Sequence, residues 1–353
     1  MSALVTGGAG FIGSNLADRL ATEGLSVVVF DALARPGVER NLAWLKERHG
    51  PKIIEVIADV RDRRAVKAAA AGAEVIFHMA AQVAVTTSLL DTREDFETNV
   101  AGTLNVLDAA RLQNTPVIFA STNKVYGDLV HVPLELASNA YQPRDEALRQ
   151  AGVDETRPLD FRTPYGCSKG AADQYVLDHA RSFGLPTCVF RMSCIYGPRQ
   201  MGTEDQGWVA HFLIRALRGE TINLYGDGRQ VRDILCVDDA VEAYMAAWRR
   251  IDDISGRVFN LGGGPANAVS LLQLIDYIEQ LTGRKMDVSH SDWRAGDQRY
   301  YVSDPALARR ELELGRPIAW REGVAALADW LRPRGSAVTG VRGRTLEAAC
   351  PLI

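Results

Sequence analysis

Cysteine is scarce in this sequence, and the few cysteines follow no pattern. An odd number of scattered cysteines does not build a disulfide framework, and their spacing differs from that of metal ligands. We therefore expect reduced cysteines that behave as small hydrophobic side chains, and no metal site. The five are Cys167, Cys188, Cys194, Cys236 and Cys350.

Long apolar runs and basic runs are also missing from the 353 residues. No stretch is long enough to span a bilayer, and the chain begins with a strand-like pattern instead of a charged targeting region. The formal net charge of −4 gives no reason to expect nucleic acid or an anionic membrane as a partner. With 47% hydrophobic and 24% charged residues, the composition is typical of a soluble globular protein, which we expect in the cytoplasm.

The N-terminal segment has the pattern of a strand, a glycine turn and a helix. Residues 2–5 are apolar, residues 6–13 read Thr-Gly-Gly-Ala-Gly-Phe-Ile-Gly, and residues 14–23 are amphipathic. Glycines let the backbone turn tightly and approach a pyrophosphate, which then sits against the unpaired N–H groups of the helix start. The candidate dinucleotide-binding residues of this turn are Gly7, Gly10, Phe11, Ile12 and Gly13.

Two later strand patterns end in a carboxylate. Asp31 follows the second apolar run, where an acidic side chain can accept both hydroxyls of an adenosine ribose. It would repel a 2′-phosphate, so NAD is favoured over NADP, although the nearby Arg35 keeps NADP open. Asp59 and Val60 follow the third apolar run and are predicted to meet the adenine.

Strand and helix patterns alternate along this half of the chain. Further strands are predicted at residues 74–81 and 116–120, with a long helix over residues 91–112 between them. Such alternation indicates an α/β protein with a parallel, doubly wound Rossmann sheet, whose ligand lies beyond the carboxyl ends of the strands.

Residues 163–184 form a run of helix formers that begins at a proline and ends at a glycine. Tyr165 and Lys169 are four positions apart, so phenol and ammonium lie on one face of the predicted helix. A neighbouring positive charge lowers the pKa of a phenol, which makes the pair a candidate acid/base couple. One such spacing also arises by chance, and Cys167 between them lies on a different face.

Ordered motifs extend over residues 3–332. They include His78-Met-Ala-Ala81, Asn99-Val-Ala-Gly-Thr103, residues 121–127, Tyr165-x-x-x-Lys169, residues 191–198, residues 226–233 and Arg294-Ala-Gly-Asp297. In this order they closely resemble an extended short-chain dehydrogenase/reductase of the sugar-nucleotide epimerase/dehydratase family. Within that family, residues 122–128, 165–175 and 205–208 are most similar to the tyvelose epimerases, which invert C2 of CDP-paratose.

The resemblance implies roles for the candidate couple. Tyr165 would take the proton of a sugar hydroxyl while NAD takes the hydride from the same carbon. Lys169 would hold the nicotinamide ribose and lower the pKa of Tyr165, and Thr122 would hydrogen-bond the reacting oxygen. In an epimerase the keto intermediate receives the hydride on its other face, so NAD is regenerated and stays bound. The resemblance also places Ala80 and Asn99 at the cofactor, and Gln82 and Asn123 at the substrate.

The residues after Thr122 separate the chemistries of the family. Dehydratases usually carry an Asp-Glu pair there as acid and base, and related decarboxylases generally keep a Glu. This chain has Asn123 and Lys124, so elimination lacks its carboxylates and oxidation followed by reduction at one carbon is favoured. The role of Lys124 stays unassigned, and a solvated loop charge is the structural alternative.

Two arginines correspond to family residues that grip the nucleotide diphosphate. Arg232 and Arg294 suit this role because guanidinium groups bind phosphate oxygens in fixed geometry. Salt bridges to Asp233 or Asp297 are the competing structural explanation. Many relatives carry an asparagine at the position of Cys194, which puts that sugar-diphosphate contact in doubt.

The chain is long enough for two domains. We predict an NAD-binding domain over residues 1–190, to which residues 228–262 return, and a substrate domain over residues 191–332. The polar stretch between residues 127 and 163 is longer than an ordinary connection and is either a lid or a solvated excursion. Residues 333–353 lose apolar periodicity and are expected to be a disordered tail.

The sequence thus predicts an NAD-dependent nucleotide-sugar epimerase, acting at C2 of a CDP-linked deoxyhexose. A UDP-sugar 4-epimerase shares the same machinery and is the main alternative. A non-catalytic dinucleotide sensor of the same fold is another, although a sensor has no need of a proton-transfer couple. By resemblance, helices 91–112 and 164–182 would pair between subunits of a homodimer or a higher homo-oligomer.

Overall fold

A computed structural model describes residues 1–332, and the expected tail at 333–353 lies outside this range. Its centre is a seven-stranded sheet in the order β12-β8-β5-β4-β1-β2-β3, in which every neighbouring pair is parallel. The order reverses between β1 and β4, as in a doubly wound fold. The strands are β1 (Ser2–Thr6), β2 (Ser26–Asp31), β3 (Ile53–Ile57), β4 (Val75–His78), β5 (Val117–Thr122), β8 (Thr187–Met192) and β12 (Arg257–Leu261). The predicted α/β class is confirmed.

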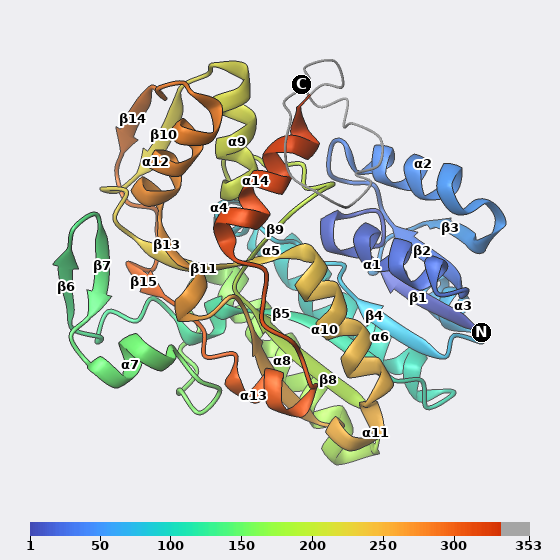
Figure 1. Cartoon of the computed structure of the whole chain (residues 1–353). Coiled ribbons are helices and arrows are strands. Elements are labelled where there is room, and N and C mark those ends of the chain that lie inside the picture. Colours follow the sequence, from blue (N-terminus) through green and yellow to red (C-terminus); the bar gives the residue numbers. More distant parts are fainter. Residues whose placement is uncertain (333–353) are drawn as a thin grey trace.

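Helices cover both faces of this sheet (Figure 1). Because both faces are covered, its central strands are buried along their whole length, and β5 reads as a continuous buried run. One core lies under α1 (Phe11–Thr22), α2 (Val38–His49), α10 (Val237–Arg249) and α11 (Ile251–Ile254). The other lies under α3 (Arg63–Ala70), α6 (Gly102–Arg111) and α8 (Thr163–Phe183).

A smaller domain with its own hydrophobic core follows β8 (Figure 1). Its strands form a two-stranded sheet, β10-β14, and a four-stranded sheet in which β11 pairs with β9, β13 and β15. Its strands are β9 (Cys194–Tyr196), β10 (Ile222–Tyr225), β11 (Val231–Cys236), β13 (Ala268–Ser270), β14 (Val288–Ser291) and β15 (Tyr300–Tyr301), and helices α9 (Trp208–Arg218), α12 (Leu271–Thr282) and α14 (Trp320–Leu331) pack on them. Helix α13 (Ala306–Glu311) instead contacts β12.

The chain returns to the large sheet later than residue 228. Strand β11 belongs to the smaller domain, where it is the central strand. Helix α10 then packs against α1, and β12 adds an edge strand beside β8. The two domains are therefore discontinuous in sequence.

The helix predicted over residues 91–112 contains a change of geometry. It runs as α5 (Thr92–Phe96), a π-helical turn η2 (Glu97–Ala101) and then α6. A π-turn widens the helix by one residue and is common at functional sites. Here it contains the buried Asn99.

The segment between residues 127 and 163 has regular structure of its own. It contains a hairpin of β6 (Leu134–Ala137) and β7 (Ala140–Pro143), followed by α7 (Glu146–Ala151). Val132 and Val153 of this segment join Tyr126 and Tyr301 in a small buried core. Its apolar side chains thus tie it to the smaller domain, so the alternative of a merely solvated excursion is wrong.

Within residues 1–332, no helix is long and apolar enough to cross a membrane, and no group of His, Cys, Asp or Glu side chains is arranged to hold a metal ion. Four of the cysteines lie in this range and all four are free: Cys167, Cys188, Cys194 and Cys236.

Candidate active site

A cavity of about 920 Å³ lies beyond the carboxyl ends of the central strands, between the large sheet and the smaller domain. Ligands of open α/β sheets bind at this position, where the strand order reverses. The predicted site residues that line it are Gly7, Gly10, Phe11, Ile12, Gly13, Asp31, Asp59, Val60, Ala80, Gln82, Thr122, Asn123, Tyr165, Lys169, Arg232 and Arg294.

The glycine turn leaves no room for side chains at two of its positions. A Cβ added to Gly13 would lie 2.1 Å from the Gly7 carbonyl oxygen, and one added to Gly7 would lie 2.8 Å from the Ala80 nitrogen. Gly7 also has a φ of +67°, which side chains rarely adopt. Gly10 is the N-cap of α1 and has no side chain to cap it, so the first amides of the helix stay available to a phosphate.

Asp31 and Asp59 stand at neighbouring strand ends. The Asp31 carboxylate accepts hydrogen bonds from the Ala9 and Leu33 amides at 3.0 and 2.9 Å, which leaves further lone pairs for ribose hydroxyls. The Asp59 carboxylate is held by the Arg61 guanidinium, which lowers the pKa of Asp59. Together with the glycine turn, these groups fit a dinucleotide. Arg35 lines the same cavity.

Thr122, Tyr165 and Lys169 meet in this cavity. Thr122 ends β5, while Tyr165 and Lys169 lie one turn apart on the buried face of α8. The Tyr165 phenol hydrogen-bonds Thr122, and the Lys169 amine lies 4.1 Å from the centre of the Phe119 ring. The predicted hydroxyl, phenol and amine are thus brought together.

The sequence predicts that Lys169 lowers the pKa of Tyr165, and the direction of this prediction is wrong. Burial raises the pKa of Tyr165 to about 12, and this outweighs the hydrogen bond from Thr122, which lowers it. Burial also lowers the pKa of Lys169 to about 7, against the pull of Asp173 and Asp95. The sequence showed the spacing of the pair but not the depth of its burial.

Helix α8 is anchored by a buried ion pair. The Arg191 guanidinium donates to both Asp173 carboxylate oxygens at 2.9 and 3.0 Å, and the Ser121 hydroxyl donates to the same carboxylate at 2.8 Å. Arg191 also donates to the Tyr126 hydroxyl at 3.2 Å. The pair fixes helix α8 against β5 and β8.

Asn99 does not line the cavity, so its prediction as a cofactor-binding residue is corrected. Its amide oxygen accepts from the Gln82 backbone N–H at 2.9 Å, and its amide nitrogen donates to the Gln82 carbonyl at 3.1 Å. It also donates to Ser168 at 2.9 Å. Asn99 therefore positions Gln82 and helix α8.

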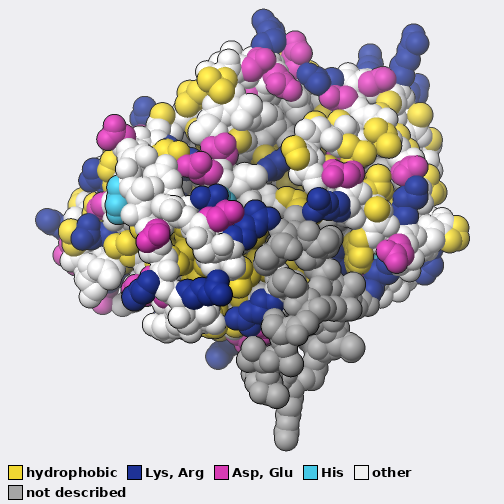
Figure 2. Space-filling view, turned by 90° about the horizontal axis from the view of Figure 1, so that it is seen from above, with side chains coloured by type: hydrophobic (Ala, Val, Ile, Leu, Met, Phe, Trp, Pro, Cys, Tyr) yellow, Lys and Arg dark blue, Asp and Glu magenta, His cyan; other side chains and the backbone are white. Residues whose placement is uncertain are grey.

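The two predicted diphosphate arginines lie at the substrate-domain side of the cavity, and both are paired. Arg232 donates to the Asp297 carboxylate at 2.6 Å and not to Asp233. Arg294 donates to the Glu204 carbonyl at 3.0 Å and lies 3.4 Å from the Asp205 carboxylate. In Figure 2, Lys and Arg side chains near the centre of one face are likewise mixed with Asp and Glu side chains.

Residues 3–262 match the NAD dependent epimerase/dehydratase family. The chain belongs to this family. It is 40% identical over 339 residues to CDP-paratose 2-epimerase of Salmonella typhi, a match that covers 94% of this chain and 99% of that one. The resemblance predicted from the ordered motifs is confirmed.

Solved structures of the epimerase/dehydratase family have the same fold. UDP-glucose 4-epimerase of Thermotoga maritima with UDP-glucose matches with a TM-score of 0.80 and 31% identity, over 93% of this chain and 98% of that one. UDP-glucose 4-epimerase of Thermus thermophilus in complex with NAD matches with a TM-score of 0.79 and 30% identity, over the same shares of the chains. The predicted NAD cofactor agrees with the family, whose members use it.

Some polar groups of this epimerase-family cavity were not predicted as site residues. Four side-chain oxygens that line it are buried without a hydrogen-bond partner, which is unusual unless a ligand or water satisfies them. They belong to Gln82, Thr86, Gln200 and Gln230. Only Gln82 was predicted, because the others stand outside the positions to which the family motifs assign a ligand.

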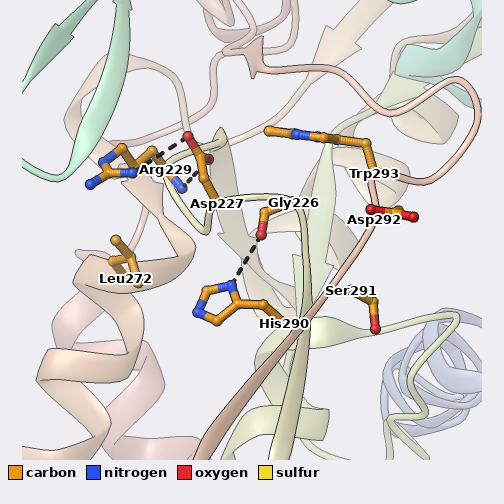
Figure 3. A pocket seen from close by; sticks show the side chains of 8 residues that line it. All are labelled: Gly226, Asp227, Arg229, Leu272, His290, Ser291, Asp292 and Trp293. Carbon is orange, nitrogen blue, oxygen red and sulfur yellow. Dashed lines mark hydrogen bonds and ion pairs between the residues drawn. The ribbon is translucent and has the colours of Figure 1, made fainter.

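A second hollow, of about 580 Å³, shares no lining residue with the family's cavity. Figure 3 shows two polar contacts among its lining residues. His290 contacts the Gly226 carbonyl at 3.1 Å, and Arg229 lies 3.6 Å from the Asp227 carboxylate. It contains none of the predicted site residues.

Proposed function

We propose that this member of the family is an NAD-dependent epimerase that inverts C2 of a CDP-linked deoxyhexose. The observation that carries the proposal is the convergence of Thr122, Tyr165 and Lys169 in the cavity, next to an amide and an amine at positions 123 and 124. The carboxylate pair that the dehydratases of the family use for elimination is absent, because positions 123 and 124 carry an amide and an amine. Similarity to the CDP-paratose 2-epimerase favours C2 and a cytidine nucleotide.

The side chains divide the proton chemistry between them. NAD, when bound, supplies the redox step by accepting and returning a hydride. Thr122 holds the sugar oxygen beside Tyr165, whose phenolate takes the hydroxyl proton and whose phenol later returns it. Because burial holds the Tyr165 pKa at about 12, phenolate formation needs the ammonium form of Lys169 one turn away.

A UDP-sugar 4-epimerase is the second candidate, since UDP-glucose 4-epimerases match nearly the whole chain. It would use the same three residues on a different carbon of the ring. A non-catalytic sensor is disfavoured. Burying a lysine and a tyrosine costs stability, and a sensor has no proton transfer that would require them.

Isotope transfer identifies the sugar carbon that is oxidised and inverted. Purified enzyme with bound NAD is incubated with CDP- and UDP-hexoses that carry deuterium at C2 or at C4, and the bound nicotinamide is analysed by mass spectrometry. We expect deuterium from C2. Deuterium from C4 alone would refute the C2 assignment, and steady release of oxidised NAD with consumption of added NADH would indicate a net reductase.

We also propose that the enzyme is a cytoplasmic homodimer or higher homo-oligomer. Free cysteines support a reducing compartment. Large apolar side chains are exposed on the two predicted pairing helices: Phe96 is 49% exposed on α5, and Tyr175 and Phe183 are 45% and 50% exposed on α8. Light scattering of the wild type and of Tyr175→Glu tests the assembly, and a monomeric wild type would refute it.

A further inference from the structure

Lys124 is fixed directly to the catalytic residues, although no role has been assigned to it. It lies in the short 3-10 turn η3 (Asn123–Tyr126) that follows β5, and its backbone N–H donates to the Thr122 hydroxyl at 3.3 Å. Its carbonyl lies against Gly166, the neighbour of Tyr165, where an added Cβ would be 3.4 Å from the oxygen. The backbone of Lys124 therefore lies directly beside Thr122 and beside the turn of α8 that contains Tyr165.

The amine of Lys124 lies in a cluster with the side chains of Arg232 and Asp297. It donates to the Gly296 carbonyl at 3.3 Å and lies 4.0 Å from the Asp297 carboxylate. That carboxylate already accepts a hydrogen bond from Arg232 at 2.6 Å. Two cations thus share one carboxylate in the cavity wall, and an anionic group of a ligand would balance the second.

The surroundings of the amine would favour an anionic ligand. Only 21% of the Lys124 side chain is exposed. Burial, with Arg232 nearby, lowers the pKa of Lys124 to about 8, although the Asp297 and Asp128 carboxylates act in the opposite direction. A phosphate close to the amine would favour its charged form. Cys194, which also lines the cavity, is a neutral thiol because burial raises its pKa, so it offers a phosphate no charge.

The proposed reaction places a phosphate at this position. In a nucleotide sugar the diphosphate is attached to C1, and C1 is bonded to C2. When C2 lies beside Thr122 and Tyr165, only C1 and one oxygen separate the reacting carbon from phosphorus. When C4 lies there, the ring itself separates the two. A cation two residues after Thr122 therefore suits C2 chemistry better than C4 chemistry.

We propose that Lys124 binds the phosphate attached to C1 of the sugar and thereby holds C2, instead of C4, beside Tyr165 and Thr122. This inference rests on the proposed epimerase function and adds a specificity residue to it. Arg232 remains paired with Asp297 and lines the same cavity.

The test compares ligands that differ only by the phosphate next to the sugar. Dissociation constants of CDP and CMP, and of UDP and UMP, are measured by calorimetry on the full chain with NAD bound. In the wild type the diphosphate binds more tightly than the monophosphate. In Lys124→Met this preference falls about tenfold to a hundredfold, as expected for one charge-assisted contact, and KM for the nucleotide sugar rises by a similar factor.

Further variants separate charge from structure. Lys124→Arg keeps the charge and should restore most of the preference for the diphosphate. Lys124→Gln keeps a donor for the Gly296 carbonyl but has no charge, and it should not restore the preference. Lys285→Met removes a lysine that is 90% exposed and paired with Glu279, and it leaves the preference unchanged. Rescue by glutamine, or an unchanged preference in Lys124→Met, would overturn the proposal.

The ratio of the diphosphate and monophosphate dissociation constants is measured without turnover. Its result can therefore contradict the phosphate contact without contradicting the proposed reaction. A reduced preference with deuterium transfer from C4 supports the phosphate contact and overturns the link between Lys124 and C2. An unchanged preference with transfer from C2 overturns the contact and leaves the epimerase function standing.

Discussion

The buried ion pair between Arg191 and Asp173 should be among the costliest interactions to break in this enzyme. The side chains are 4% and 0% exposed and are joined by two hydrogen bonds. Asp173→Asn keeps the shape but leaves the guanidinium without its counter-charge. Removing one partner of a buried pair typically costs about 3 to 5 kcal/mol, and we expect a loss of that size in the free energy of unfolding.

Urea denaturation at a fixed NAD concentration, followed by circular dichroism and tryptophan fluorescence, measures the loss. The double variant Asp173→Leu/Arg191→Met removes both charges and should recover most of it, because well-packed apolar side chains often replace a buried pair without penalty. With the single variants Asp173→Leu and Arg191→Met, the double variant completes a cycle that gives the coupling energy of the pair. A loss below about 1 kcal/mol in Asp173→Asn, the range of exposed pairs, would refute the reasoning.

Three further predictions concern the site. Tyr165→Phe should lower kcat at least about a hundredfold, as expected on loss of the general acid/base, while the absorbance of bound NAD stays unchanged; full activity would remove Tyr165 from its role. Gly13→Ala should lose NAD during gel filtration, since its Cβ would lie 2.1 Å from the Gly7 carbonyl, and normal NAD content would contradict this. His78, whose pKa burial lowers to about 3, is neutral when folded, so stability should fall as pH drops below about 6.5, by about 2 kcal/mol between pH 7 and pH 5. In His78→Gln, compared by urea titration at both pH values, this fall should shrink; an equal fall would assign it to other groups.

Local patterns were enough to predict the parallel sheet and the glycine turn. The turn lies between a buried strand and an amphipathic helix, and each part agrees with its neighbours. The spacing of Tyr165 and Lys169 likewise needed only helical geometry. Properties that depend on surroundings were missed, because spacing contains no information on burial. The raised pKa of Tyr165 is the clearest case.

The direction in which a side chain points was also beyond the sequence. Asn99 lies in a motif close to the cofactor, yet the π-turn that holds it directs its amide to the Gln82 backbone. The segment at 127–163 was judged by its polar residues, whereas its few apolar side chains decide where it packs. The return to the NAD-binding domain was predicted to begin at residue 228, but β11 pairs with β9, β13 and β15 of the smaller domain.

The edge strand β12 of the large sheet comes from a part of the chain that follows the first strands of the smaller domain, and this affects how such enzymes can diversify. A fragment that ended after β8 would leave that strand as an open edge, and Phe190 would lose its contacts with Tyr244 and Phe259. Neither half is then a transferable module. New sugar preferences are expected from changes in the segments between β8 and α10, in those that follow β12, and in the turn after β5 that contains Lys124, while the strands around them are retained.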